Sequence, residues 1–153
     1  MHVSRALTMF ATISLIGVAC SDNNTTGIPA GLKVYTATLN GANEKPTPVQ
    51  TTASGSAIVT ILGNQLSWKV DITAAIDSII AGHIHHAPID SAGGVRVNFN
   101  PAPTGIGFTG TATEGSITVA DSIIAFIDAG NAYVNIHTKA HTGGEIRGQL
   151  VRQ

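Results

Sequence analysis

Short segments in which apolar and polar residues alternate constrain the fold of this chain more than any other feature. The clearest one covers residues 65–73, where every second residue is apolar: Leu66, Trp68, Val70 and Ile72 alternate with Ser67, Lys69 and Asp71. Successive side chains of a β-strand point to opposite faces of a sheet, so this pattern predicts a strand with one buried face. The Gly63-Asn64 pair before it is typical of a tight turn.

The same pattern along the chain predicts an all-β domain. Glycines and prolines separate the segments that we interpret as strands, which are 33–40, 55–62, 65–73, 79–87, 93–99, 107–113, 132–138 and 145–151. A short helix is predicted over 119–129, with a capping box from Thr118 to Asp121 and with Gly130 at its end. About seven or eight short strands with one short helix suit a two-sheet β-sandwich or a flattened barrel. The expected core includes Trp68, Val70, Ile84, Val134, Ile136 and Ile146.

Composition excludes several kinds of partner and site. The chain has 153 residues, a one-domain length, and a formal net charge of −1, so no basic surface for nucleic acid is expected. Cys20 is the only cysteine, which rules out a disulfide within the chain and a cysteine-based zinc site. The sequence has no motif for a serine nucleophile elbow or a phosphate-binding loop. We therefore expect a binding or structural module rather than an enzyme.

The N-terminal residues are organised like a bacterial lipoprotein signal. Arg5 precedes an uncharged run at residues 6–19 that is too short for a comfortable transmembrane helix. The sequence Leu15-Ile-Gly-Val-Ala-Cys20 resembles a lipobox, although Gly17 stands where leucine is usual. In that family of signals the cysteine is lipidated and becomes the mature N-terminus.

These features predict where the protein is located. We expect a signal peptide over 1–19, lipidation of Cys20, a flexible tether over 20–32 and a β domain over 33–153. The lipid would bind the membrane and hold the domain at the cell envelope, facing the periplasm or the cell surface. An ordinary signal followed by a chance cysteine would instead give a secreted protein without an anchor.

Three parts of the predicted domain together resemble the CHRD domain, which is named for its occurrence in chordin and is also found in microbial secreted proteins. The first part is LNGANEKP with ASGSA, the second is GHIHHAP with GGV, and the third is YVNIHT followed by GGEIRGQ. The resemblance spans residues 33–151 and implies a β-rich extracellular module. It implies no catalytic residues.

Three histidines are candidate ligands for copper or zinc. His83 and His85 are two apart on a predicted strand, so they share a face, and His137 lies on the polar face of another. If these strands are neighbours, three imidazoles converge, which suits either metal and leaves an open position. A His-x-His pair on a β-sandwich strand is also similar to the copper site of copper-zinc superoxide dismutases. The alternative is that these histidines only make hydrogen bonds to loops. His141 is a weaker candidate.

A second candidate polar site consists of Asn135, Glu145 and Arg147. Glu145 and Arg147 share one face of a predicted strand and would bind a polar ligand, or form local ion pairs and fix the turn at 142–144. Two functions follow from these features. The first is an envelope module that recognises an extracellular protein or a glycan, and the alternative is a copper- or zinc-binding protein with redox activity in the copper case.

Overall fold

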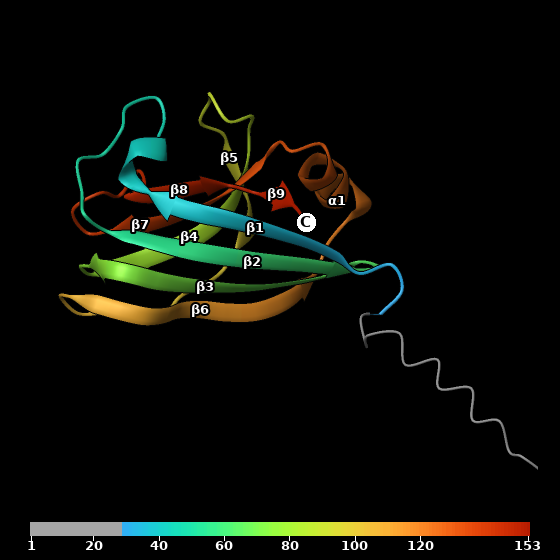
Figure 1. The fold of residues 1–153 in the computed structure, drawn as a ribbon, viewed down its shortest axis with the longest axis horizontal. Coiled ribbons are helices and arrows are strands. Elements are labelled where there is room, and N and C mark those ends of the chain that lie inside the picture. Colours follow the sequence, from blue (N-terminus) through green and yellow to red (C-terminus); the bar gives the residue numbers. More distant parts are fainter. Residues whose placement is uncertain (1–28) are drawn as a thin grey trace, which may run out of the picture.

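The computed structural model describes residues 29–153 (Figure 1). The predicted signal peptide, Cys20 and residues 21–28 of the predicted tether lie outside the described residues. Within residues 29–153, the structure has no helix long and apolar enough to cross a membrane.

The described chain forms nine strands, one α-helix and one turn of 3-10 helix, η1. The strands are β1 (Lys33–Asn40), β2 (Ser54–Leu62), β3 (Gln65–Ile76), β4 (Ile79–His86), β5 (Gly94–Asn98), β6 (Phe108–Thr118), β7 (Ala132–Thr138), β8 (Ile146–Gln149) and β9 (Val151–Arg152). The helices are η1 (Gly41–Asn43) and α1 (Asp121–Asp128). The predicted all-β class with one short α-helix is confirmed.

All these strands belong to one antiparallel sheet with the order β5-β4-β7-β8-β1-β2-β3-β6, and β9 pairs with β1. The sheet curls so that β1, β2, β3 and β6 form one layer and β8, β7 and β4 lie behind it (Figure 1). The result is a single curled sheet in the form of a half-barrel, consistent with the sandwich or flattened barrel that the strand count predicted. Because β4 and β7 pair directly, residues 54 apart in the sequence become cross-strand neighbours.

Side chains connect the two ends of the curled sheet. Phe99 follows β5, and its carbonyl accepts a hydrogen bond of 3.2 Å from the Thr113 hydroxyl of β6. The ring of Phe99 also stacks on Trp68 of β3, with 4.8 Å between ring centroids. These contacts join the β5 end of the sheet to β3 and β6, and so cover the apolar core between the two ends.

The core fills the space between the two layers. It consists of the inward-facing residues of the strands, and five of the six predicted core residues are fully buried: Val70, Ile84, Val134, Ile136 and Ile146. The sixth prediction, Trp68, is wrong, because this ring is only half-buried at the edge of the core. Its indole N–H donates to Thr113, and its ring covers Gly115, where an added Cβ would lie 2.7 Å from the indole. Because Trp68 lies at the edge of the core, where the two ends of the sheet meet, one side of its ring stays in contact with solvent.

Several predicted boundaries differ from the structure. Strand β3 runs to Ile76, three residues beyond its predicted end, and the strand predicted over 145–151 is divided into β8 and β9. Strand β6 extends to Thr118, five residues beyond the predicted end, because residues 114–118 pair with the first residues of β3. The predicted capping box is also wrong, because Thr118 lies in β6 and donates to Gln65. The cap of α1 is Ala120, which offers no side-chain bond. Gly130 does follow the helix with a φ of 73°, as predicted.

The helix is fixed to the first strand by Asp128. Lys33 lies 2.6 Å from the Asp128 carboxylate, and the Tyr35 hydroxyl donates to the same carboxylate. Burial and this contact raise the pKa of Tyr35 well above its usual range, so the hydroxyl stays protonated.

Candidate metal centre

The outer face of β4, β7 and β8 carries a set of polar side chains that the loops cover. On β7 these are Tyr133, Asn135 and His137, which alternate with the core residues Val134 and Ile136. All seven residues of the strand are buried, although only one face meets the core. Three segments cover the second face: the one after β1, the one between β4 and β5, and the one between β7 and β8. Each makes a hydrogen bond to a polar side chain of this face.

Strand pairing brings the three candidate histidines together. His83 lies opposite Asn135, His85 lies opposite Tyr133, and His137 lies opposite Ala81. The ring centroid of His83 lies 4.7 Å from that of His137 and 5.3 Å from that of His85, and the centroids of His85 and His137 lie 5.6 Å apart. One ring nitrogen from each residue lies within 4.8 Å of the other two. The two strands are neighbours, so the condition for the three imidazoles to converge is met.

Backbone carbonyls orient two of the three rings. The Nδ1 atom of His85 lies 2.9 Å from the Gly93 carbonyl, and Nδ1 of His137 lies 3.0 Å from the Thr142 carbonyl. A carbonyl only accepts, so both Nδ1 atoms carry the proton and both Nε2 atoms keep a free lone pair. An imidazole held through one nitrogen in this way presents the other to a metal.

The third ring turns its Nδ1 atom towards the pair. His83 Nδ1 lies 2.9 Å from His137 Nε2. Since His137 Nε2 has no proton when Nδ1 donates to Thr142, His83 Nδ1 is the donor here. The ring nitrogens that face one another are thus Nδ1 of His83 and Nε2 of His137, while Nε2 of His85 is buried without a hydrogen-bond partner.

The environment keeps these imidazoles neutral. Burial, together with the nearby His137 and His85, lowers the pKa of His83 to about 4. Burial also lowers the pKa of His85 and of His137, partly offset by the carbonyls of Gly93 and Thr142. Neutral imidazole is the form that ligates a metal.

The loop between β4 and β5 is held over this site by Gly93. Its carbonyl accepts from His85, and its N–H donates to the Tyr133 hydroxyl at 3.1 Å. A Cβ at this position would lie 1.9 Å from the His86 carbonyl oxygen, so only glycine fits. Gly93 therefore connects the ring orientation of His85 to the loop conformation.

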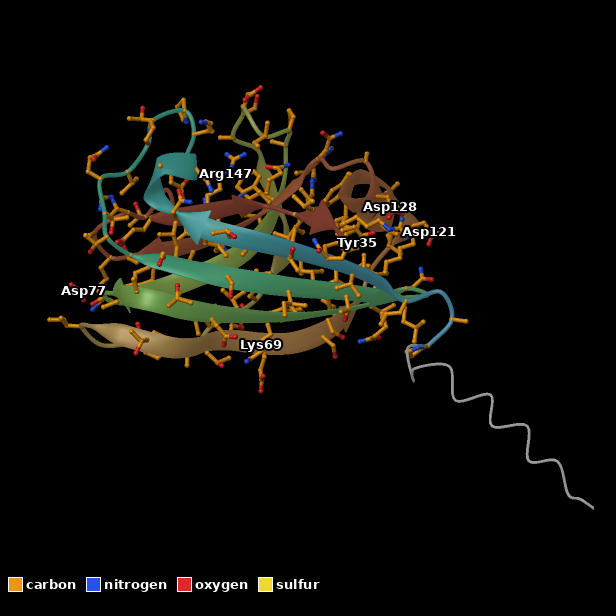
Figure 2. The ribbon with its side chains drawn as sticks, in the orientation of Figure 1. Tyr35, Lys69, Asp77, Asp121, Asp128 and Arg147 are labelled. Carbon is orange, nitrogen blue, oxygen red and sulfur yellow. The ribbon has the colours of Figure 1, made fainter. Side chains whose placement is uncertain are left out.

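Tyr133 separates the histidines from Arg147. Its ring stacks on His85 with 4.8 Å between centroids and an angle of 8°, and the Arg147 guanidinium lies 3.5 Å from its other face. Arg147 Nη2 donates to the carbonyls of Pro88 and Ile89 at 3.3 Å each. The stack and these bonds fix the loop from a second direction. In Figure 2, Arg147 lies in the upper part of the view, and Lys69 of β3 lies in the lower part.

The predicted ion pair of Glu145 with Arg147 is not formed. Glu145 instead accepts from the hydroxyls of Thr51 and Thr138, at 2.8 and 2.6 Å. These two residues flank it, whereas Arg147 points one strand position further along, towards Tyr133. Glu145 also does not fix the turn at 142–144 through its side chain; that turn is bonded to His137.

Glu44 is a site residue that sequence reasoning missed. It follows η1, is 4 % exposed, and accepts from the Asn135 amide at 3.3 Å. Burial raises the pKa of Glu44 to about 7, partly offset by Asn135 and Arg147. Its signal was its place in the NGANEKP segment, but a lone glutamate between prolines and asparagines is typical of an exposed loop.

Two other histidines do not join the cluster. His86 is exposed on the opposite face and stacks on Phe126, with 4.5 Å between ring centroids. His141 lies in the segment between β7 and β8, outside the group of three. The predicted site is therefore limited to His83, His85 and His137.

Buried polar atoms without a partner gather on this same face. Within the described residues they are Glu44 Oε1, His85 Nε2, Asn135 Oδ1, Arg147 Nη1 and Gln149 Oε1. Buried polar groups in native proteins almost always have a partner, so each such atom requires an explanation. Their concentration on one face indicates that bound water, an ion or a ligand completes it.

Comparison with known proteins identifies the family. No curated protein and no solved structure matches the chain. The sequence profile of the CHRD domain matches residues 35–150, which run from β1 to the end of β8 and include every residue of the histidine cluster. The three segments that resembled this domain all lie within the match. The chain belongs to the CHRD domain family.

Proposed function

We propose that this CHRD domain binds one copper or zinc ion at the cell envelope. The ligands are Nδ1 of His83, Nε2 of His85 and Nε2 of His137. The observation that carries the proposal is the convergence of three ring nitrogens within 4.8 Å on a face covered by loops. It favours the metal-binding alternative over a purely structural module.

The separations between the three ring nitrogens require only a small adjustment to match those around a zinc ion. Two ligands of a tetrahedral zinc ion are separated by about 3.4 Å, since each zinc–nitrogen bond is about 2.0–2.1 Å. The pair His83 and His137 already lies at 2.9 Å, and His85 has to approach them from no more than 4.8 Å. Small side-chain rotations of His85 and of the half-buried His83 would supply this movement.

The donor set is consistent with copper or zinc. Imidazole suits both metals, and hard cations such as magnesium or calcium prefer oxygen. Three protein ligands leave a position for water or a small molecule, and copper would add one-electron chemistry there. The protein's own contribution is to keep the three imidazoles neutral and to hold two of them, His85 and His137, in place through the carbonyls of Gly93 and Thr142.

The envelope location rests on the N-terminal sequence. Lipidation of Cys20 would attach the domain to a membrane, and residues 21–32 would separate the lipid from β1. This arrangement presents the metal site in a compartment outside the cytoplasm.

The test is a zinc and copper titration of chain without a histidine tag, comparing His85→Ala with His86→Ala. The two histidines are sequence neighbours on opposite faces, so His86→Ala is a matched control. We expect one ion per chain for wild type and for His86→Ala. The metal affinity of His85→Ala should fall by more than about 10–100-fold, which is the loss typical of removing a group that only orients a ligand. Equal binding by His85→Ala and wild type overturns the proposal.

A further inference from the structure

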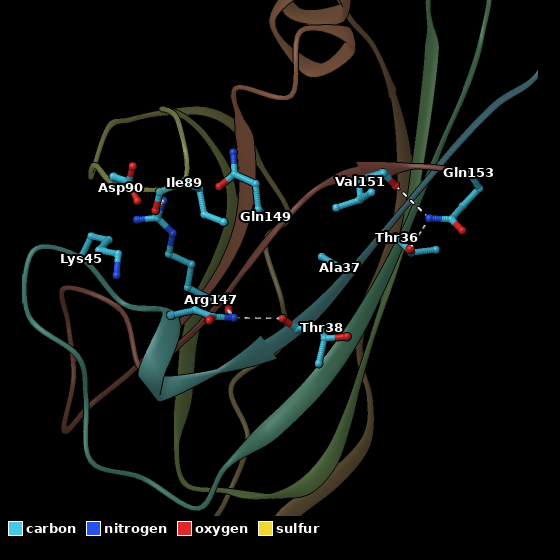
Figure 3. A pocket seen from close by; sticks show the side chains of 11 residues that line it. Thr36, Ala37, Thr38, Lys45, Ile89, Asp90, Arg147, Gln149, Val151 and Gln153 are labelled. Carbon is cyan, nitrogen blue, oxygen red and sulfur yellow. Dashed lines mark hydrogen bonds between the residues drawn. The ribbon is translucent and has the colours of Figure 1, made fainter.

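A pocket on the outer face holds a buried cation that the metal site does not use. The pocket has a volume of about 510 Å³, within the range of about 300–1,000 Å³ that is typical of ligand sites. Arg147 and Gln149 line it from β8, Thr38 from β1, and Asn43, Lys45 and Asp90 from the covering segments. Figure 3 shows the Arg147 side chain reaching from β8 towards Ile89 and Asp90, with Lys45 beside it.

The charge of Arg147 has no acidic partner among the described residues. Arg147 is 1 % exposed, and no carboxylate of residues 29–153 lies within 4 Å of its guanidinium. Its Nη1 atom makes no hydrogen bond, nor does the neighbouring Gln149 Oε1. A buried charge without a counter-charge is costly, so an anion that reaches the guanidinium gains strong, charge-assisted hydrogen bonds.

The buried carboxyl of Glu44 does not neutralise this cation fully. Glu44 interacts with Arg147 electrostatically, but burial raises its pKa to about 7, so it is only partly ionised at neutral pH. Lys45 adds a second positive charge to the pocket, and no described carboxylate lies within 4 Å of it. Two cations, one buried and one half-buried, thus face one cavity with one exposed acid, Asp90.

The other lining groups indicate what else the ligand presents. The Thr38 hydroxyl, the amide oxygens of Asn43 and Gln149 and the Asp90 carboxylate are hydrogen-bonding groups suited to hydroxyls. The amide nitrogens of Asn43 and Gln149 already donate to backbone carbonyls. A ligand with one carboxylate and several hydroxyls satisfies both the cations and these neutral groups. An acidic peptide would supply the carboxylate but few hydroxyls.

We propose that this pocket binds an acidic sugar, a uronate unit of an extracellular glycan, with its carboxylate between Lys45 and Arg147. Lys45 contacts the carboxylate directly. Arg147 lines the same pocket, but its Nη1 atom is buried. A carboxylate would therefore reach Nη1 only after the exposed Ile89 side chain, which also lines the pocket, moves aside. The proposal does not depend on the metal, because no pocket residue is one of its ligands.

The experiment is calorimetric titration with a galacturonate trisaccharide, and with the neutral galactose trisaccharide of the same linkage. Triglutamate serves as the acidic peptide. Of the three compounds, we expect only the galacturonate trisaccharide to bind. Added salt should weaken this binding because the contact is ionic. Lys45→Ala should weaken it about tenfold or more, since one charge-assisted hydrogen bond is lost.

Lys69→Ala is the matched control, because Lys69 is an exposed lysine of β3 outside this pocket. It should bind the galacturonate as wild type does. Arg147→Lys tests the buried cation, and Lys45→Ala keeps the test valid should the Arg147 variant not fold. No galacturonate binding, equal binding of triglutamate, or unchanged binding by Lys45→Ala overturns the proposal. Metal titration of Lys45→Ala should match wild type, which separates failure here from failure of the metal site.

Discussion

The Nδ1 atom of His83 lies 2.9 Å from the Nε2 atom of His137, and 54 residues separate the two in the chain. One proton occupies the space between these nitrogens, and it belongs to His83, because His137 donates its own proton to Thr142. A metal ion that takes this place requires His83 to carry its proton on Nε2 instead. Binding therefore exchanges one tautomer for another and needs no net loss of a proton, because the rings are already neutral.

Gly93→Ala should weaken metal binding without touching a ligand. A Cβ there lies 1.9 Å from the His86 carbonyl oxygen, so the loop must move and the Gly93 carbonyl leaves His85. We expect about 10–100-fold weaker zinc or copper binding, as is typical when the group that orients a ligand is lost. Competition with a chelator of known affinity measures the change.

The adjacent Gly94 supplies the control. An added Cβ at Gly94 meets nothing within 4 Å, so Gly94→Ala should bind metal like wild type. If both variants keep full affinity, the Gly93 carbonyl does not orient His85.

Ile136→Ala should destabilise the domain by about 2–5 kcal/mol, because it leaves a cavity in the core. Ile136 is fully buried and shares β7 with Asn135 and His137. Urea unfolding measures the loss. Ile58→Ala is the comparison, since Ile58 is 48 % exposed and its loss should change stability by about 0.5 kcal/mol or less. A similar small change for Ile136→Ala would contradict the assigned faces.

The sequence predicted the faces of the strands but not their neighbours. Period-two alternation places His83 and His85 on one side and Val134 and Ile136 on the other, and both assignments hold. Whether β4 lies beside β7 depends on pairing between segments far apart in the chain, which local patterns do not encode. The histidine cluster could therefore be predicted only on the condition that these two strands pair.

What covers the polar face was not predictable either. Alternating strands usually leave their polar face in water, yet Asn135 and Arg147 are buried beneath loops. Glu44 reaches Asn135 across 91 residues of sequence, and Arg147 holds Pro88 across 59. Loops without periodicity carry little signal about where they pack, so Glu44 looked like an exposed loop residue.

Cys20→Ser should release the protein from membranes. The uncharged run that ends at Ala19-Cys20 predicts lipidation, which needs the thiol. We expect the variant in the soluble fraction, with slower signal removal and no incorporation of labelled fatty acid. Ser21→Ala is the control and should fractionate with membranes. A Cys20→Ser protein that fractionates and migrates like wild type would exclude the anchor.

Glu44→Gln should stabilise the metal-free domain at alkaline pH. Burial raises the pKa of Glu44 from its ordinary value to about 7, so the folded state prefers the protonated carboxyl. A carboxyl of this kind stabilises the fold fully below its unfolded pKa of about 4.3, and the contribution is lost as pH rises through about 7. Glutamine mimics the protonated form at every pH and can still accept from Asn135.

We therefore expect Glu44→Gln to match wild type near pH 4 and to be more stable by about 1–3 kcal/mol near pH 8. Urea unfolding with a chelator present measures both. His83, His85 and His137 also titrate in this range, but they are common to both proteins and cancel in the difference. Glu114→Gln makes the same change at an exposed position of β6 and should show no pH-dependent difference. A Glu44→Gln protein that is less stable than wild type at pH 8 would mean that ionised Glu44 is needed as the counter-charge of Arg147.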